Sequence, residues 1–378
     1  MKTKQLQFIN KTWKSFPSTT YAYKCSLVLA FGSPGVITEP EVFSYLKDEF
    51  PNADIVMSTT AGEIINDLVF DDTVVVTGLE FEKSTSKCVE TNIKLHKNSF
   101  DLGCFLMQNL LKDDLKAVFI VSDGTFINGS ELVHGLNEKN INQVPITGGL
   151  AGDADRFEKT FTSLNAMPSQ GNVIAIGFYG NDLVISHGSL GGWDEFGHER
   201  MITKAEKNVL YEIDHKNALA LYKEYLGPYV KELPASALLF PLSILIEGSE
   251  KSLVRTILSI DEENKTMTFA GNLPIGSKVR LMKANFEKLI TASSVAAQNS
   301  FLSLGNQKPD LSILVSCVGR KLVLQERIDE EVEAATKIIG ENTTISGFYS
   351  YGEISPFDRS TRCELHNQTM TITTITEV

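Results

Sequence analysis

The sequence contains few cysteines, and none of them is spaced to hold a metal ion. The five residues Cys25, Cys88, Cys104, Cys317 and Cys363 are an odd number, spread along the chain without a CxxC pair. This pattern supports neither a disulfide framework nor a cysteine-based zinc site. We therefore expect a protein of the reducing cytoplasm.

Long apolar segments are also missing. The longest run, Ala237 to Ile246, is interrupted by Pro241, and the N-terminal stretch Met1 to Trp13 is polar. A membrane span needs about 20 apolar residues, and a signal peptide needs an apolar segment near its start. We expect no signal peptide and no membrane insertion.

The chain has fewer positively charged residues than negatively charged ones. The chain has 35 Lys and Arg against 47 Asp and Glu, which gives a net charge of −12. The electric field of a protein with this negative net charge repels phosphate backbones and anionic lipid headgroups, so we expect no nucleic-acid partner. The apolar fraction of 42% over 378 residues is that of a folded globular chain with two or three domains.

Several signatures of catalysis and metal binding are absent. The sequence has no GxSxG, GxxxxGK[ST], GxGxxG or DxDxDG motif, and its six histidines form neither HxH nor HExxH. A single histidine can still ligate haem. His187 is the candidate for that role, because it lies beside a glycine-rich segment that carries Trp193.

A β-α-β pattern occurs three times in the sequence. Each copy has an apolar stretch, a glycine turn, a helical segment and a second apolar stretch. The first stretches end at Phe31, Val121 and Ser316, and the second stretches end at Met57, Thr147 and Ser346, respectively. We expect parallel strand pairs with right-handed helical crossovers. Strand-like segments with period-two alternation lie between the copies. The predicted fold class is mixed α/β (α+β), with repeated β-α-β units, antiparallel strand additions and two domains.

Local signals refine this division. Thr38 and Glu41 have the spacing of a capping box, which predicts a helix start, and a long helix is expected from Asn285 to about Leu304. The segment from Gly188 to Gly197 is so rich in glycine that it is expected to be a loop, where its aromatics pack an interface or wall a pocket. We expect an N-terminal extension at residues 1–24 and domains at residues 25–195 and 196–378.

Each second strand leads into a loop in which glycine precedes an acid. The three pairs are Gly62-Glu63, Gly152-Asp153 and Gly352-Glu353. Loops at the carboxyl ends of parallel strands form ligand crevices, where glycine admits a ligand and a carboxylate accepts hydrogen bonds from an amine. The alternative is that the glycines make turns and the acids cap nearby backbone. Alternation places Tyr349 and Tyr351 on one side of the third loop, so both are candidate pocket residues beside Glu353.

A catalytic alternative rests on Cys317, which ends an apolar stretch just before Gly319 and Arg320. A cysteine in this position is a candidate nucleophile, but nothing in the sequence assigns it a base. A buried structural cysteine is the favoured interpretation.

Longer motifs resemble a known family. They lie at residues 58–64, 148–153, 187–206, 211–214, 273–276, 316–320, 347–356 and 365–369, so they span most of the chain. The sequence is similar to a stand-alone FIST protein, in which an N-terminal FIST domain precedes a C-terminal one. Two departures are Asp214-His215, where the family often has Asp-Gly, and extra residues around Leu190.

The resemblance implies a bacterial sensory protein. Family members are thought to bind small ligands such as amino acids and are often linked to histidine kinases or cyclic-di-GMP enzymes. A subset resembles haem-binding nitric oxide sensors. We therefore expect a cytoplasmic sensor that binds a ligand in a cleft and passes its signal to a separate partner, such as a histidine kinase or diguanylate cyclase. A haem-based nitric oxide sensor and an enzyme using Cys317 or the loop carboxylates are the alternatives.

Overall fold

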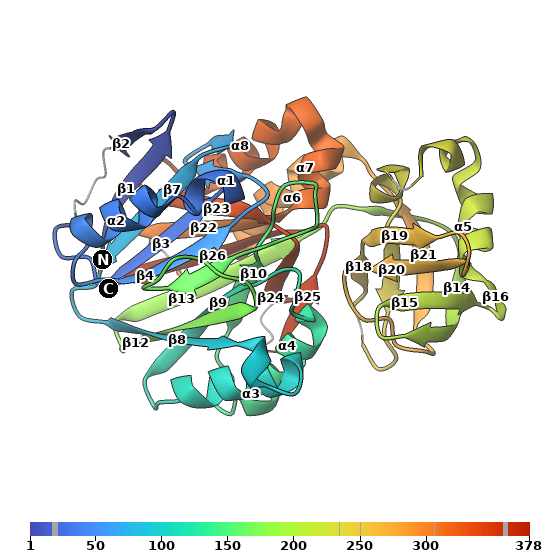
Figure 1. The fold of residues 1–378 in the computed structure, drawn as a ribbon, viewed down its shortest axis with the longest axis horizontal. Helices are drawn as coiled ribbons and strands as arrows, with labels where there is room; N and C mark the ends of the chain where they lie inside the picture. Colours follow the sequence, from blue (N-terminus) through green and yellow to red (C-terminus); the bar gives the residue numbers. More distant parts are fainter. Residues whose placement is uncertain (17–21, 234, 250, 306, 358–361) are drawn as a thin grey trace.

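The computed structural model describes residues 1–16, 22–233, 235–249, 251–305, 307–357 and 362–378. Figure 1 shows two bodies of unequal size. The larger one contains three six-stranded sheets, and the smaller one contains a single sheet built from residues 194–283. In the part of the chain that is described, no helix is long and apolar enough to span a membrane.

The three sheets of the larger body share one plan. Sheet A has the order β11 (Thr162–Leu164), β4 (Asp54–Thr59), β3 (Leu27–Gly32), β7 (Val74–Glu80), β1 (Lys2–Ile9) and β2 (Thr12–Phe16). Sheet C has the order β25 (Cys363–His366), β24 (Gly352–Pro356), β10 (Ile146–Leu150), β9 (Leu115–Ser122), β12 (Asn172–Tyr179) and β8 (Thr85–Asn92). Sheet B has the order β13 (Leu183–Leu190), β26 (Met370–Glu377), β22 (Leu311–Cys317), β23 (Thr344–Ser350), β5 (Glu63–Ile65) and β6 (Leu68–Phe70).

Each sheet is centred on one parallel pair with antiparallel strands on both sides. The pairs are β3 with β4, β9 with β10, and β22 with β23. These are the three pairs that the repeated sequence pattern predicts, so the predicted parallel pairing and the mixed α+β fold class are confirmed. A continuous apolar strand such as β3 is buried on both faces, which is the reason that the pattern is readable in the sequence.

The sheets exchange strands in a cycle. After its parallel pair, each unit sends one or two short strands to the neighbouring sheet: β5 joins β23 and carries β6 beside it, β24 joins β10 and carries β25 beside it, and β11 joins β4. The chain then returns to its own sheet through β7, β26 or β12. Each sheet is therefore completed by another unit, and the three units form one body around a pseudo-threefold arrangement.

Helices cover the outer faces of the sheets, and a shared core fills the centre. The helices of this body are α1 (Pro34–Ile37), α2 (Pro40–Glu49), η1 (Ile93–Leu95), α3 (Ser99–Leu110), α4 (Gly129–Lys139), α6 (Phe286–Asn299), α7 (Val318–Leu324), η4 (Gln325–Arg327) and α8 (Ile328–Ile339). The central core joins side chains from all three sheets, among them Phe31, Phe119 and Val315. The rings of Phe31 and Phe348 lie 4.5 Å apart between two of the sheets. Burial of such large side chains contributes about 1.5 to 3 kcal/mol each.

The smaller body is inserted into the third unit, between β13 and α6. Its sheet has the order β18 (Leu253–Arg255), β17 (Leu242–Leu245), β21 (Lys278–Lys283), β14 (Asp194–Glu206), β15 (Val209–Ile213), β20 (Thr266–Phe269) and β19 (Ile257–Asp261), with β16 (Lys216–Asn217) beside β15. Its helices are α5 (Ala218–Leu226), η2 (Gly227–Glu232) and η3 (Ala235–Leu239). Only Thr256 separates β18 from β19, so the chain itself joins the two ends of this sheet.

The expected domain boundary falls close to the point where the chain enters the smaller body. Residues 286–378 then return to the larger body, a feature that the predicted division at residues 195 and 196 does not contain. The expected N-terminal extension includes β1 and β2, which pair within sheet A. The division of the sequence into domains of residues 25–195 and 196–378 stays a prediction.

Three local expectations were wrong. The glycine-rich segment from Gly188 to Gly197 belongs largely to strands β13 and β14, because its backbone groups pair with β26 and β21. Glu39, not Thr38, precedes α2, and its side chain makes no capping hydrogen bond. The long helix α6 ends at Asn299, five residues before Leu304, where the chain turns to enter sheet B.

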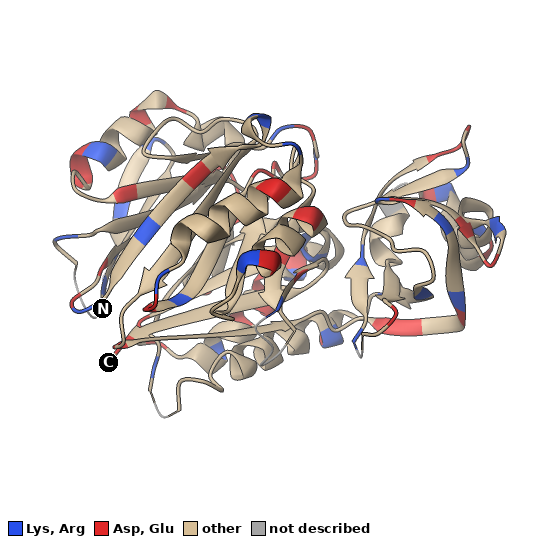
Figure 2. Cartoon of the chain, turned by 90° about the horizontal axis from the view of Figure 1, so that it is seen from below, with Lys and Arg blue, Asp and Glu red and all other residues tan. Residues whose placement is uncertain are grey.

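Charged residues of both signs are spread over the helices and loops of both bodies. Figure 2 shows Lys and Arg positions interspersed with Asp and Glu positions along the ribbon of both bodies. This distribution agrees with the net charge of −12.

Candidate functional site

The three glycine-acid loops meet where the strands cross between sheets. Backbone amides link the units in a ring: Ala61 N donates to Tyr349 O at 2.9 Å, Tyr351 N to Leu150 O at 3.1 Å, and Gly152 N to Thr59 O at 3.1 Å. The structure therefore brings all three predicted loops into one central arrangement. A Cβ at Gly152 would lie 2.9 Å from the amide nitrogen of Ala61, so this close backbone approach requires glycine.

Glu63 is fully buried and bonded by its own chain. Its carboxylate accepts hydrogen bonds from the hydroxyls of Thr60 at 2.5 Å and Ser33 at 3.1 Å, and from the amide and hydroxyl of Thr73 at 3.2 and 2.9 Å. Burial raises the pKa of Glu63 to about 7, although these hydrogen bonds oppose the shift. At this position the acid holds the start of β5 against the turn before β7.

Glu353 has the same kind of environment. It accepts hydrogen bonds from Ser350 Oγ at 2.6 Å and from the amide and hydroxyl of Thr369 at 3.2 and 3.0 Å. Burial raises its pKa to about 8. Glu63 and Glu353 thus close two of the three crossings with equivalent contacts, and we call these crossings the closed junctions.

The third crossing has a different construction. Three residues lie between Thr59 and Glu63 and three between Tyr349 and Glu353, but eleven lie between Leu150 and Thr162. The extra residues form a loop at residues 153–161, whose first member is Asp153. We call this crossing the open junction, because Asp155 and Phe157 in the loop lie at the surface.

Asp153 is buried and holds that loop through hydrogen bonds to its backbone. It accepts hydrogen bonds from the amides of Glu158 at 3.1 Å and Lys159 at 2.9 Å, and from the hydroxyl of Tyr351. The same hydroxyl accepts a hydrogen bond from the amide of Phe157 at 3.0 Å. The phenol of Tyr351 therefore connects the buried carboxylate to the exposed part of the loop, and burial together with the Asp153 carboxylate raises the pKa of this phenol.

Phe157 is held in an unusual conformation. Its φ is 54°, in the left-handed region, and its ring stacks on Tyr351 with centroids 4.4 Å apart and an interplanar angle of 19°. Bulky residues rarely adopt this conformation, which costs about 1 to 2 kcal/mol. Strained residues of this kind cluster at functional sites, so the loop is a candidate ligand contact.

A cavity of about 520 Å³ lies beside this loop, between the two bodies. The larger body lines it with Asp155, Phe157, Leu322, Val323 and Gln325, and the smaller body with Glu232, Ser236, Leu238, Leu239, Ile257 and Leu258. Its volume is in the range of small-molecule sites, about 300 to 1,000 Å³. This interdomain cavity is our candidate functional site.

The chain crosses between the bodies next to the cavity. Trp193, at one crossing, is buried and donates a hydrogen bond from Nε1 to Gln368 O at 3.0 Å. It packs with Val323 and Leu289 in a small cluster next to the cavity. A ligand in the cavity would therefore lie next to one of the two chain crossings that connect the bodies. The role of Trp193 as a ligand-binding residue, suggested by its place in the glycine-rich segment, stays a prediction.

Arg320 stabilises the larger body's side of this crossing. Its guanidinium is fully buried, pairs with Glu331 at 2.8 Å, and donates to the carbonyls of Gly191 at 2.5 Å and Leu289 at 2.8 Å. Tyr349 donates its hydroxyl to the same Glu331 at 2.8 Å. Tyr349 and Tyr351, expected to face one pocket, thus have different partners.

A second contact joins the bodies on the far side. Arg255 of β18 is buried and donates from Nη1 to Leu365 O at 2.9 Å, and burial lowers its pKa to about 10. Asn272 N donates to Ser130 Oγ at 3.1 Å at the start of α4. The two bodies therefore touch on both sides of the crossing.

Two buried amides near the crossing have no hydrogen-bond partner among the described residues. They belong to Asn367 and Gln368, both fully buried. Buried polar groups normally find a partner, so unsatisfied ones indicate an ordered water or another bound molecule. Both residues belong to the motif at 365–369 that the sequence analysis noted, but no sequence signal shows that they lack partners.

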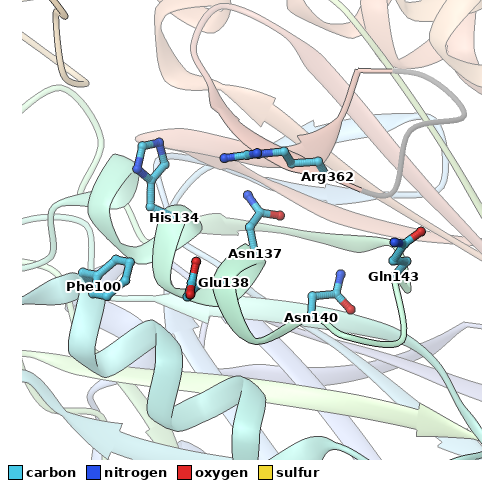
Figure 3. A pocket seen from close by; sticks show the side chains of 7 residues that line it. All are labelled: Phe100, His134, Asn137, Glu138, Asn140, Gln143 and Arg362. Carbon is cyan, nitrogen blue, oxygen red and sulfur yellow. The ribbon is translucent and has the colours of Figure 1, made fainter.

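Another cavity, of about 340 Å³, lies on the outer side of α4. Figure 3 shows Arg362 reaching over His134, Asn137 and Glu138. The Asn137 amide is already bonded to the backbone of Cys363, at 2.8 and 3.1 Å, so it holds β25 against α4. Two of the residues that line this cavity, Asn137 and Asn140, are therefore already used in contacts within the fold.

The remaining sequence candidates lie apart from the interdomain cavity. His187 is on β13, opposite Thr373 of β26, and does not line the cavity. Cys317 is buried at the end of β22, and burial raises the pKa of its thiol. A buried thiol with a raised pKa has little of the thiolate that a nucleophile needs. Among the described residues there is no group of three or more His, Cys, Asp or Glu side chains that could hold a metal ion.

Glu63, Asp153 and Glu353, with Gly62, Gly152 and Gly352, lie around the central ring and not on the cavity surface. Their predicted role in ligand binding stays a prediction. The residues that sequence reasoning missed are Asp155 and Phe157, and the cavity walls from η3 and β19. The length of the loop at 153–161, compared with the other two units, was the available signal.

Comparison with known proteins assigns the family. Residues 26–216 match the FIST N domain and residues 218–356 match the FIST C domain. An uncharacterised protein of Methanocaldococcus jannaschii, MJ1623, is 26% identical over 283 residues, which cover 66% of this chain and 52% of that protein. The chain thus spans about half the length of this relative. A solved structure of PurLQS from Thermotoga maritima aligns over 84% of this chain and 74% of its own, with 9% identity and a TM-score of 0.21. The two domain matches together cover most of the sequence, and the chain belongs to the FIST family.

Proposed function

We propose that this protein is a cytoplasmic sensor that binds a small ligand in the interdomain cavity and controls a separate signalling protein. FIST domains form a sensory, small-ligand-binding family, and this supports the general role. The single observation that carries the site is the cavity of about 520 Å³ between the two bodies, next to the strained loop of the open junction.

The position of the cavity supplies a means of signalling. A ligand shifts a conformational equilibrium only when it binds one arrangement better than another. Because Leu322 and Leu258 line the cavity from different bodies, a bound molecule gains full contact only when the bodies are close together. The ligand would therefore favour a closed arrangement, and a partner that recognises that arrangement would respond. A histidine kinase or a cyclic-di-GMP enzyme is the partner class that the family resemblance implies.

The haem alternative has less support. His187 lies on β13 and does not line the interdomain cavity. Catalysis by Cys317 is disfavoured because burial, together with the nearby carboxylate of Glu353, raises the pKa of its thiol.

The proposal is tested by blocking the cavity. Leu258 is 41% exposed and lines the cavity. The variant Leu258→Arg should therefore fold normally, and the longer arginine side chain should occupy the cavity. Leu302 is 56% exposed and does not line the cavity, so Leu302→Arg is the matched control. We expect mass spectrometry to find a small molecule copurifying with the native protein and with Leu302→Arg, and absent from Leu258→Arg.

Retention of the same molecule by a folded Leu258→Arg protein would overturn the assignment of the site. Circular dichroism and a melting curve establish that both variants are folded.

A further inference from the structure

We infer that the interdomain cavity selects molecules with an apolar body and one cationic nitrogen, and rejects molecules whose only charge is negative. This inference rests on the proposed function and names the ligand class. It comes from the side chains that line the cavity, taken together with their distribution over the two bodies.

The ionisable side chains of the cavity are all acidic. Asp155 and Glu232 line it, and among its described lining residues there is no Lys, Arg or His. The nearby cations have other partners: Arg156 lies 3.9 Å from Asp153, and Lys321 pairs with Asp71. A carboxylate or phosphate ligand would meet two like charges without a counter-charge, whereas an amine would meet two acceptors.

The remaining surface is mainly apolar. Leu238, Leu239, Ile257, Leu258, Leu322 and Val323 contribute most of it. Ser236 is buried and uses its hydroxyl as a donor to Tyr229 O at 2.9 Å, so it offers a ligand an acceptor more than a donor. Such a surface fits a hydrocarbon body, with hydrogen bonds concentrated at the acidic end.

Phe157 adds a second attraction for a cation. One face of its ring stacks on Tyr351, and the residue is 38% exposed, which leaves ring surface available to the cavity. A cation over an aromatic face within about 6 Å is attracted by the ring quadrupole. The backbone strain at Phe157 is explained if the ring is placed there to contact the ligand.

The two acids that line the cavity come from different bodies. Asp155 belongs to the larger body and Glu232 to the smaller one, so their repulsion opposes closure when the cavity is empty of a cation. An amine between them converts that repulsion into two attractions. The charge of the ligand, and not only its size, would then drive the closed arrangement.

The experiment uses three probes of matched shape on the full chain: 2-phenylethylamine, 2-phenylethanol and 3-phenylpropionate. Calorimetric titration should show binding in the order amine, alcohol, carboxylate, with the amine at least about tenfold tighter than the carboxylate. Binding of the amine should weaken as the salt concentration rises.

Two variants and a control locate the effect. Glu232→Gln and Asp155→Asn should each weaken the binding of the amine about three- to tenfold and leave the binding of the alcohol unchanged. Glu263→Gln, an exposed acid of the smaller body outside the cavity, should have no effect. Equal or tighter binding of 3-phenylpropionate, lost in Leu258→Arg, would overturn the amine inference and leave the cavity as the binding site.

If no probe binds at millimolar concentration, the amine inference is overturned. The proposed function is then still decided by whether a copurified molecule is lost in Leu258→Arg. The two failures are therefore distinguishable.

Discussion

The closed junctions and the open junction all carry the chain from one sheet to the next, but the open junction uses more residues to do so. At Glu63 and Glu353, only three residues carry the chain from one sheet to the next, and both carboxyl oxygens accept hydrogen bonds from within the protein. At Asp153, eight further residues leave the sheet and expose Phe157 beside the interdomain cavity.

The difference separates the feature that the three junctions share, a buried acid, from the feature that only one junction has, a loop exposed at the surface. A buried carboxylate that receives three or four hydrogen bonds from its own chain is well placed to hold strands together and poorly placed to meet a ligand. In the loop at residues 153–161, the buried Asp153 and Tyr351 hold the backbone in place while other side chains of the loop stay exposed. The departure from the repeat therefore indicates function more clearly than the repeat does.

The largest expected effect is on folding, at the closed junctions. Glu353→Leu or Glu63→Leu would leave several buried donors without an acceptor, and each such donor costs about 1 to 3 kcal/mol. We expect a loss of about 3 kcal/mol or more in the free energy of unfolding, measured by urea denaturation. Glu263→Gln should be neutral.

The same residues allow a test of the sequence hypothesis that Glu353 contacts the ligand. A Glu353→Gln variant with a normal melting curve and lost ligand binding would contradict our comparison and restore Glu353 as a ligand carboxylate.

The second effect is a pH dependence of stability. Glu63 and Glu353 have an ordinary pKa of 4.5, raised by burial to about 7 and about 8 in the folded chain. Their neutral forms therefore stabilise the fold fully below pH 4.5, and this contribution is lost as pH rises toward 7 to 8. Urea denaturation between pH 5 and 8 should show a decline that becomes shallower in Glu63→Gln and Glu353→Gln. An unchanged slope in both variants would show that other groups cause the decline.

A third effect distinguishes two tyrosines. Tyr351→Phe removes the hydroxyl that joins Asp153 to the amide of Phe157, and should cost about 1 kcal/mol of stability and weaken ligand retention. Tyr349→Phe removes a bond to Glu331 and should lower stability without changing retention. Thermal melting together with mass spectrometry of the copurified molecule makes the comparison. Equal retention by both variants would mean that the loop is not held for the ligand.

The smallest expected change in stability is at Phe157. Phe157→Gly relieves a left-handed conformation that costs about 1 to 2 kcal/mol and loses a stacking contact of about 0.5 to 1.5 kcal/mol. The two terms nearly cancel, so we expect a melting temperature close to that of the native protein and a clear loss of amine binding. Phe126→Ala, at an exposed aromatic outside the cavity, is the control. Amine affinity that survives Phe157→Gly would remove this ring from the site.

The sequence by itself determined the elements whose signals are local. Strands such as β3 and β22 are continuous apolar runs, and their parallel pairing was predicted because a helical segment links each to its partner strand. The family also follows from the order of short motifs along the chain.

Only the tertiary structure decided which units exchange strands, and that β13 and β14 are strands despite their glycines, because those strands depend on partners far away in the sequence. The cavity is a further case. Asp155 and Glu232 carry no shared sequence pattern, and they line one cavity only because the inserted body packs beside α7 and the loop at residues 153–161.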